Sequence, residues 1–437
     1  MVALGTRCQQ LIQMSDDKYR WQIGSPPPFL DRHSQTKHSI IEEYVRQYIL
    51  TLMAPAQIPE LRLSIIDGFC GGGCYVTEDG KLVDGSPLLM MRAVREARMM
   101  LNQERRNPRN INVHYSFIDI LPDTTRYLSH WLTAKRDENA IDLADYRQTD
   151  VMTSDFLKSL PSLIQKVQQR KMGEHALFVL DQYSYKDIPL PEIANILRTL
   201  KGAEILMTFN VDNLITYLSD RAANRKPLEK IGLNRYIPWA KLRSLKATQK
   251  QEWRRTLQRH LAHGIKYETG AQFMTLFFVR PHGLNSWGYW LIHLSNQYRA
   301  HEVMKTIHWK HATEFGHELE PGVFVLGYNA NKDDTYTGQQ TFEFGGAGSK
   351  AACINGVREY FGQTIFQLDK PTRIADLFQN CISISTAAEN HLMEAARQLH
   401  ASKNIIIVSK DGTVRRTNKT YSLSDMVEPS KQIILIN

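Results

Sequence analysis

The feature that most constrains this chain is an apolar segment that ends in an acid and runs into glycines. Residues 64–75 read Ser-Ile-Ile-Asp-Gly-Phe-Cys-Gly-Gly-Gly-Cys-Tyr. This pattern predicts a buried strand followed by a loop whose backbone can approach a ligand closely, because glycine has no side chain. Ser86 and Pro87 then suit the N-cap and the first position of a helix. Strand, glycine loop and helix together form the opening unit of a doubly wound nucleotide-type fold.

Further apolar segments alternate with helical ones along the first half of the chain. The predicted strands are 61–66, 111–118, 146–149, 176–180 and 203–209, and predicted helices cover 88–101 and 124–135. Such alternation predicts an α/β fold with a parallel sheet joined by right-handed crossovers. Two adjacent strands, 272–279 and 288–294, then predict an antiparallel hairpin at the sheet edge, as in Rossmann-like methyltransferases.

At 437 residues the chain is long enough for two or three domains. We expect an N-terminal arm and helix over 1–60, with the helix at 36–52, and an α/β domain over 61–313. A segment rich in Gly, Asn, Asp, Thr and Gln predicts a linker over 314–350. Over 351–437, helices precede two short strands, 404–408 and 413–416, joined by an Asp-Gly turn, which resembles a winged helix-turn-helix.

Charge and cysteine content narrow the functional classes. The net charge of +9 favours a polyanionic partner such as DNA or RNA, although scattered lysines produce the same total. Five dispersed cysteines lack the spacing of a disulfide framework, which indicates a reducing, cytoplasmic environment. No signal-peptide pattern is present, and no apolar run approaches the roughly 20 residues of a membrane span, so no membrane partner is expected.

The acids at strand ends predict a cofactor site. Ligands of open parallel sheets bind at the carboxyl ends of strands, where the glycine loop and successive acids meet. The spacing is not that of a dinucleotide fingerprint, and no Gly-Lys-Ser or Gly-Lys-Thr follows the glycines. The order of acid and glycines instead resembles the first motif of S-adenosylmethionine-dependent methyltransferases, and the predicted cofactor-binding residues are Asp67, Phe69, Gly71, Gly73, Asp119 and Asp150. Loop capping by Asp67 and ordinary turn chemistry at the other two acids are the alternative interpretations.

The fourth predicted strand ends in Asp181-Gln182-Tyr183-Ser184-Tyr185. Amino-methylating enzymes carry an Asp or Asn, two prolines and an aromatic residue here, and the aromatic ring stacks on an extruded base. Asp181 and Tyr183 are therefore the predicted catalytic residues. Both prolines are missing, so a tyrosine pair that covers the sheet edge is an equally good interpretation.

Two further groups of residues are candidate sites. The predicted C-terminal hairpin is surrounded by basic residues that could follow a phosphate backbone, or simply be solvated: Lys403, Lys410, Arg415, Arg416 and Lys419. Cys70 and Cys74 have no second pair, and Thr77 stands where a radical iron–sulfur site would need a third cysteine. We therefore expect buried thiols and no metal.

Several of these motifs together resemble the three-Cys-motif partner protein family (TcmP). The resemblance is carried by Thr36-Lys37-His38, Ile66 to Gly73, Gly85-Ser86-Pro87 and Leu180 to Lys186, and covers most of residues 36–310. It implies a Rossmann methyltransferase-like domain with a C-terminal winged helix, and a radical-type three-cysteine protein as partner. The family typically has Asp-Pro-Phe-Gly where this chain has Asp181-Gln182-Tyr183-Ser184, and Ala where it has Cys70.

The leading hypothesis from the sequence is an S-adenosylmethionine-dependent methyltransferase-like protein that acts on or near nucleic acid. The missing prolines support a different class, a catalytically inactive scaffold of the same fold that binds nucleic acid or a partner enzyme. A nucleotide-hydrolysing enzyme is disfavoured by the absent phosphate-loop lysine.

Overall fold

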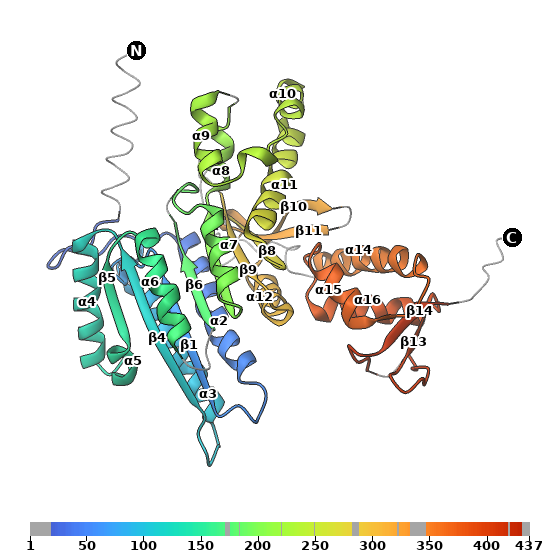
Figure 1. Ribbon diagram of the computed structural model, residues 1–437, viewed down its shortest axis with the longest axis horizontal. Coiled ribbons are helices and arrows are strands. Elements are labelled where there is room, and N and C mark those ends of the chain that lie inside the picture. Colours follow the sequence, from blue (N-terminus) through green and yellow to red (C-terminus); the bar gives the residue numbers. More distant parts are fainter. Residues whose placement is uncertain are drawn as a thin grey trace. The chain divides into compact units, whose positions relative to one another are not determined.

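The computed structural model describes residues 19–170, 175–182, 184–219, 221–248, 250–281, 288–320, 323–332, 347–417 and 420–430 (Figure 1). The chain divides into two compact units. The first comprises residues 1–274 and 281–297, and the second comprises 275–280 and 298–437. None of the described helices is long and apolar enough to cross a membrane.

A nine-stranded mixed sheet is the main feature of the fold. Its strand order is β10-β11-β8-β9-β7-β6-β1-β4-β5. The five strands from β7 to β5 are parallel, β9 is antiparallel to β7, and β10 is antiparallel to β11. The strands are β1 Glu60–Asp67, β4 Asn110–Asp119, β5 Thr149–Thr153, β6 Ala176–Leu180, β7 Ala203–Phe209, β8 Phe273–Arg280, β9 Tyr289–Ser295, β10 Glu314–Glu320 and β11 Val323–Asn329.

Helices connect the parallel strands, as the alternating pattern predicts. The helices of the first unit are α2 Arg32–Leu52, α3 Ser86–Asn102, α4 Pro122–Asp137, α5 Leu143–Arg147, α6 Phe156–Gln169, α7 Leu190–Thr199, α8 Val211–Tyr217, α9 Ala222–Lys230, α10 Trp239–Thr248 and α11 Lys250–Thr269. Of these, α2 precedes β1, and α8 to α11 lie between β7 and β8. A two-stranded ribbon, β2 Cys74–Val76 and β3 Leu82–Asp84, lies between the glycine loop and α3. Helix α3 begins at Ser86, with Gly85 rather than Ser86 as its N-cap.

Four of the five predicted parallel strands are confirmed, and the third is displaced. Tyr146 and Arg147 belong to the short helix α5, in which the Tyr146 N–H donates to the Asp142 carbonyl. The strand β5 starts only at Thr149 and runs to Thr153. Its apolar content is confined to Val151 and Met152, both only partly buried, so no apolar pattern marks where this edge strand begins.

The second unit differs from the prediction in the segment expected to be a linker. Within the predicted linker at 314–350, residues 314–320 and 323–329 form the antiparallel strands β10 and β11, β11 runs parallel to β8, and α14 begins at Ala347. Residues 321–322 and 333–346 of that range lie outside the described residues. The helices of the second unit are α12 Tyr298–His311, α14 Ala347–Phe366, α15 Ile374–Ile382 and α16 Glu389–Ala401, and a second sheet has the order β12-β14-β13, with β12 Thr372–Arg373, β13 Ile405–Val408 and β14 Met426–Pro429.

The C-terminal hairpin differs from the prediction in its second strand. The turn at Asp411 and Gly412 forms as expected, with a φ of 86° at the glycine. Residues 413–416 contribute only one bridge, Val414 to Val408, whereas the antiparallel partner of β13 is β14. Local turn chemistry was correctly predicted, but strand pairing depends on a segment ten residues farther along the chain.

A buried polar cluster ties α2 to the sheet. The Tyr44 hydroxyl donates to the Glu204 carboxylate, and His293 Nε2 lies 3.1 Å from Glu204 and 3.0 Å from the Tyr44 hydroxyl. Tyr44 and His293 are 0% exposed and Glu204 3%. These residues come from α2, β7 and β9, so the cluster holds three distant segments together. A buried carboxylate needs such partners, because burial without them is costly.

Replacing Tyr44 by Phe should therefore lower the free energy of unfolding by about 1–3 kcal/mol, because Glu204 loses a buried hydrogen-bond donor. Urea unfolding followed by circular dichroism measures the change. Tyr48→Phe is the matched control: its ring stacks on Tyr44, and its buried hydroxyl has no hydrogen-bond partner among the described residues. Equal losses in the two variants would show that the hydroxyl of Tyr44 contributes nothing specific.

Candidate functional site

A cavity of about 550 Å³ lies at the carboxyl ends of four parallel strands. Phe69 and Gly71 line it after β1, Asp119 at the end of β4, and Asp181 directly after β6. Thr208 in β7 and Asn210, which follows that strand, also line it, and further lining comes from the N-terminal arm, α2, Tyr75, the start of α4 and Tyr289. Parallel strands in this order bring residues far apart in sequence to one edge, which is where such sheets bind ligands.

The glycine loop is held between neighbouring strands and beneath an indole ring. Its N–H groups at Gly68 and Cys70 donate to carbonyls of β6 and β4 at 2.9 Å. A Cβ atom on Gly72 would lie 2.2 Å from the Trp21 ring. Gly71 has a φ of 59°, a left-handed conformation that favours glycine. The loop therefore needs its glycines for packing against Trp21 as well as for backbone geometry.

Asp67 is the buried acid of the site. It is 0% exposed, and its carboxylate accepts hydrogen bonds from the Ser86 hydroxyl at 2.6 Å and the Phe69 N–H at 3.1 Å. Burial raises the pKa of Asp67 to about 7, although the bonds from Ser86 and Phe69 oppose this shift. The capping interpretation of Asp67 thus holds for the Phe69 N–H, while Ser86 connects the same carboxylate to the start of α3.

Asp119 faces the cavity directly. It ends β4, and its carboxylate accepts a 2.9 Å hydrogen bond from the Leu121 N–H. Burial raises the pKa of Asp119, while hydrogen bonds from the backbone of Leu121 and Gly71 lower it. Ile120 and Leu121, which follow it, are 65% and 47% exposed and also line the cavity. The cavity thus offers a carboxylate next to apolar surface.

Asp150 lies elsewhere, which corrects its predicted position. It is the second residue of β5 and pairs with Ser116, whereas Thr153 is the residue opposite Asp119. Its carboxylate accepts a 2.8 Å bond from Lys166 and lies 3.4 Å from His114, outside the residues that line the cavity. Because the strand continues for three residues beyond it, Asp150 is not at the carboxyl end of the sheet.

Asp181 is paired with a lysine of α2. The Lys37 ammonium donates to the Asp181 carboxylate; the lysine side chain is 9% exposed and the aspartate side chain 34%. Burial favours a higher pKa for Asp181, but the charge and hydrogen bond of Lys37 outweigh it and lower the pKa. Burial and the neighbouring Lys37 lower the pKa of His38 to about 3, so this imidazole is neutral near pH 7.

Gln182 has a structural role where amino-methylating enzymes have proline. Its amide donates to the Thr208 carbonyl at 2.8 Å, its side-chain oxygen accepts from the Ile188 N–H at 3.1 Å, and its own carbonyl accepts from the Thr208 hydroxyl. These bonds tie the end of β6 to β7. They order the turn without a proline ring. Tyr183 lies outside the described residues.

The sequence prediction missed the wall of the cavity. Tyr19 and Trp21 come from an arm without periodicity, and the Trp21 Nε1 donates to the Cys74 carbonyl at 2.7 Å. Lys37 had a detectable signal: it lies four residues before buried Ile41 and seven before Tyr44, so a helix places this charge on the apolar face. A lysine on a buried helix face needs an acidic partner.

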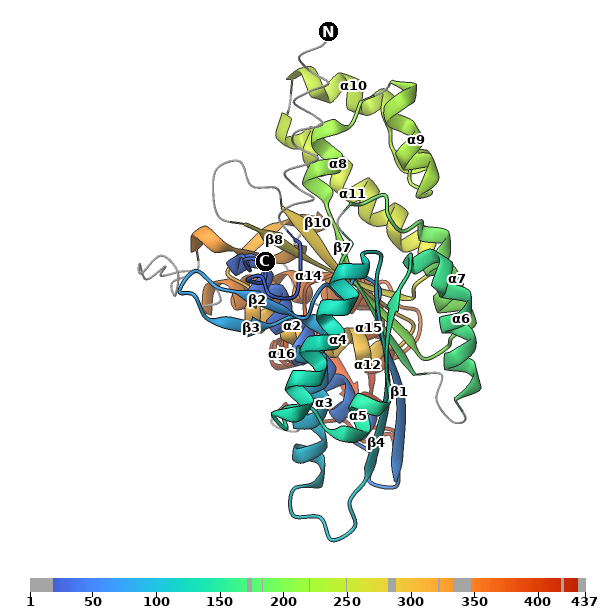
Figure 2. The same cartoon turned by 90° about the vertical axis from the view of Figure 1, so that its left-hand side faces the viewer.

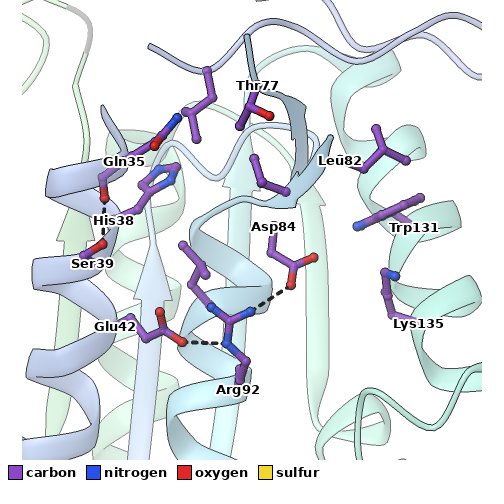
Figure 3. Close-up of a pocket in the computed structure, with 13 residues that line it drawn as sticks. Gln35, His38, Ser39, Glu42, Thr77, Leu82, Asp84, Arg92, Trp131 and Lys135 are labelled. Carbon is purple, nitrogen blue, oxygen red and sulfur yellow. Dashed lines mark hydrogen bonds and ion pairs between the residues drawn. The ribbon is translucent and has the colours of Figure 1, made fainter. Parts of the chain in front are cut away.

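A second cavity of about 440 Å³ adjoins the first and shares Leu30 and His38 with it. Figure 3 shows Arg92 between Glu42 and Asp84, which accept hydrogen bonds from its guanidinium at 2.6 and 3.2 Å. Opposite them, Trp131 and Lys135 project from α4, and the lysine ammonium lies 4.8 Å from the indole centroid. The charges of Arg92 are thus already matched within the protein.

The predicted phosphate contacts near the C-terminus divide into three groups. Lys403, Lys410 and Arg416 are exposed. Arg415 makes two hydrogen bonds of 2.9 and 3.0 Å to Asp425, which is 1% exposed, so this arginine holds the loop before β14. Lys419 lies outside the described residues.

The cysteines of the glycine loop are buried free thiols. Burial raises the pKa of Cys74 to about 11, so the thiol is protonated at neutral pH. Within the described part of the chain, no three His, Cys, Asp or Glu side chains form a group that could hold a metal ion.

The raised pKa of Asp67 predicts a pH-dependent stability. Its carboxyl titrates near pH 4 when unfolded and near pH 7 when folded, so the folded state binds the extra proton between these values. The free energy of unfolding should fall with rising pH in that window, by up to about 1.4 kcal/mol per pH unit from this group. Urea unfolding of wild type and Asp67→Asn from pH 5 to 8 tests this, with Asp150→Asn as control. Parallel pH profiles for wild type and Asp67→Asn would contradict it.

Comparison with known proteins adds no relative to this description. No protein-family model matches the chain, and no curated protein sequence matches it. The sheet order and the two cavities therefore stand as the basis for interpretation. They establish an α/β protein with a large, mostly parallel mixed sheet and a cavity at the carboxyl ends of its strands.

Proposed function

We propose that this protein is an S-adenosylmethionine-dependent methyltransferase-like protein that acts on or near nucleic acid. The strand order carries the proposal: from β5 through β4, β1, β6 and β7 the strands are parallel, and β9 is inserted antiparallel between β7 and β8. Such an antiparallel insertion is typical of Rossmann-like methyltransferases, the fold that the resemblance to the three-Cys-motif partner family implies. In this chain β11 and β10 extend the sheet beyond β8, so the predicted hairpin does not form the sheet edge. The helices and small sheet at residues 347–430 are compatible with the winged helix of that family.

The cavity residues fit such a cofactor. The volume of the cavity, about 550 Å³, lies within the range of small-molecule sites, roughly 300–1,000 Å³. Asp119 would accept hydrogen bonds from ribose hydroxyls, Ile120 and Leu121 would cover an adenine ring, and the glycine loop would let the cofactor approach the backbone. Bound there, S-adenosylmethionine supplies an electrophilic methyl group. Asp67 would act through Ser86 and the loop, because its carboxylate is fully buried.

Asp181 is the residue on which turnover depends. Its carboxylate, partly open to the cavity, would orient an acceptor amine by accepting its hydrogen bond. The pairing with Lys37 keeps this carboxylate ionised, as a hydrogen-bond acceptor requires. Tyr183 would add the stacking surface for a base. The acceptor polymer would be DNA or RNA, and a radical-type three-cysteine protein is the partner implied by family resemblance.

The catalytically inactive scaffold is the second candidate, and one observation favours it. The Asp181 carboxylate already accepts a hydrogen bond from the Lys37 ammonium. The Gln182 side chain is likewise hydrogen-bonded within the protein, to the Thr208 carbonyl of β7 and the Ile188 N–H. An acceptor amine would have to share Asp181 with Lys37. In a scaffold, this partly buried pair would serve only to hold α2 against the end of β6.

Calorimetry with S-adenosylmethionine tests the cofactor assignment. Wild type should bind, and Asp119→Ala should weaken binding about 10- to 100-fold, because a charged acceptor for the ribose hydroxyls is lost. Asp150→Ala is the matched control: this strand acid lies outside the cavity and should leave affinity unchanged. No heat of binding to folded wild type, or equal losses in both variants, would refute the proposed cofactor site.

Methyl transfer to DNA, RNA and copurifying protein distinguishes enzyme from scaffold. If the protein is an enzyme, Asp181→Asn should reduce transfer at least about 100-fold while S-adenosylmethionine binding survives. The double variant Lys37→Met/Asp181→Asn removes both members of the buried pair and controls for an unpaired lysine. Transfer that is absent in cofactor-binding wild type, with every acceptor, would instead support the scaffold.

A further inference from the structure

We propose that the helical insert between β7 and β8 binds single-stranded nucleic acid along one exposed face of α11. Residues 221–269 of this insert contain thirteen Lys and Arg against three Asp and Glu, a net charge of +10. The whole chain carries +9, so the remaining residues together carry −1. The basic character of the protein therefore belongs to this one segment, and a polyanion would be attracted to it.

The proposed surface is a stripe of four residues on α11: Arg255, Arg259, His263 and Tyr267. They follow one another at intervals of four and are all exposed, with Tyr267 68% exposed. The opposite face of the helix is buried through Leu257, Leu261 and Ile265, each 0% exposed. The helical period thus separates a core face from a face of cations and aromatic rings.

The aromatic half of the stripe is ordered by stacking. The rings of His263 and Tyr267 lie with centroids 6.2 Å apart and planes at 25°, and Tyr236 lies 5.9 Å from both. Exposed aromatic rings next to cations suit unpaired bases attached to a phosphate backbone, because every base offers a face for stacking. A duplex conceals those faces, so the stripe favours a single strand.

The cations of the stripe are available, whereas their neighbours are used within the protein. Arg254 pairs with Asp212, and Arg235 pairs with Glu268. No hydrogen bond or ion pair is found for the side chains of Arg255 or Arg259 across the described ranges. Lys226, Lys230 and Lys241 of the same insert are also exposed. The positive surroundings also affect His260: burial is the main cause of its lowered pKa, and the nearby Lys241, His263 and Arg259 lower this pKa further.

The insert begins at the rim of the cavity. Asn210, directly after β7, lines the cavity and caps α8 by accepting a hydrogen bond from the Asn213 N–H. Two residues later, the Asp212 carboxylate accepts a hydrogen bond from the guanidinium of Arg254 and another, of 2.8 Å, from the N–H of Gly288. Gly288 directly precedes the cavity residue Tyr289. Figure 2 shows α9 and α10 projecting beyond α8 from this part of the fold. A strand bound on α11 would thus pass near the cavity.

The C-terminal hairpin is the weaker candidate for the same partner. Between residues 399 and 430 five Lys and Arg face three Asp and Glu, and Arg415 is committed to Asp425. Backbone binding requires cations that can exchange counterions for phosphates. The insert has more of them, and it adds exposed aromatic rings, whereas Tyr421 and His400 of the hairpin segment are buried.

Fluorescence anisotropy with the full chain and a labelled oligothymidine of about 20 nucleotides tests the surface, with salt varied from 50 to 200 mM. Arg255→Ala/Arg259→Ala should weaken binding about tenfold at low salt and reduce the salt slope by about 1.4, roughly 0.7 per phosphate contact. Tyr267→Ala should weaken binding about tenfold without changing the slope. Arg255→Lys/Arg259→Lys should restore most of the affinity and shows that the fold is intact.

Lys410→Ala/Arg416→Ala is the charge-matched control on the hairpin and should bind as wild type does. An equal or larger loss in this control, tighter binding of a duplex of the same length, or no oligonucleotide binding by wild type would overturn the proposal. The choice of partner rests on the proposed function, but the binding assay needs no cofactor. Oligonucleotide binding without S-adenosylmethionine binding would refute the cofactor site alone.

Discussion

The packing of the glycine loop between β4 and β6 is the constraint on which the rest of the site depends. Gly68 and Cys70 donate their N–H groups to the two neighbouring strands, so the loop cannot shift without breaking hydrogen bonds of the sheet. Asp67 is buried as a consequence, and Trp21 closes the loop from the other side. The loop thereby fixes one wall of the cavity, and the ends of β4, β6 and β7 supply the others.

The cavity and the helical insert differ in how their charges are arranged. Inside the cavity, the charge of Lys37 is matched by Asp181, and His38 beside them is kept neutral by burial and by Lys37. Residues 221–269 of the insert, by contrast, contain thirteen Lys and Arg and only three Asp and Glu, so most of their positive charges have no acidic counterpart within the segment. Buried charges need partners because desolvation is costly, whereas exposed like charges are tolerated by solvent and become useful only to a polyanion. The first arrangement suits a small polar ligand and the second suits a polymer.

The parts of the fold that were predictable share a physical cause. β6 is buried on every residue and reads as an uninterrupted apolar run, and α2 places its apolar residues at helical spacing, so both were located from local pattern. The position of Asp119 at the end of a strand was predicted correctly, because β4 is long and has apolar residues at alternate positions before that acid. β5 was misplaced because an edge strand with partly buried residues has no such contrast. Because the predicted strand ended too early, Asp150 was predicted to lie in the cofactor site. In the structure its carboxylate lies next to His114 and Lys166 instead.

The sequence by itself determined the alternating α/β pattern, the glycine loop and the acids Asp67, Asp119 and Asp181, because strand ends, glycines and periodicity are local properties. Only the tertiary structure decided what surrounds them. The pairing of Lys37 with Asp181 spans 144 residues, and Trp21 reaches the Cys74 carbonyl over 53. The extension of the sheet by β11 and β10 beyond β8, and the pairing of β13 with β14, likewise depend on which distant backbones come into register. Such contacts are chosen by packing of the whole chain, and no local pattern encodes them.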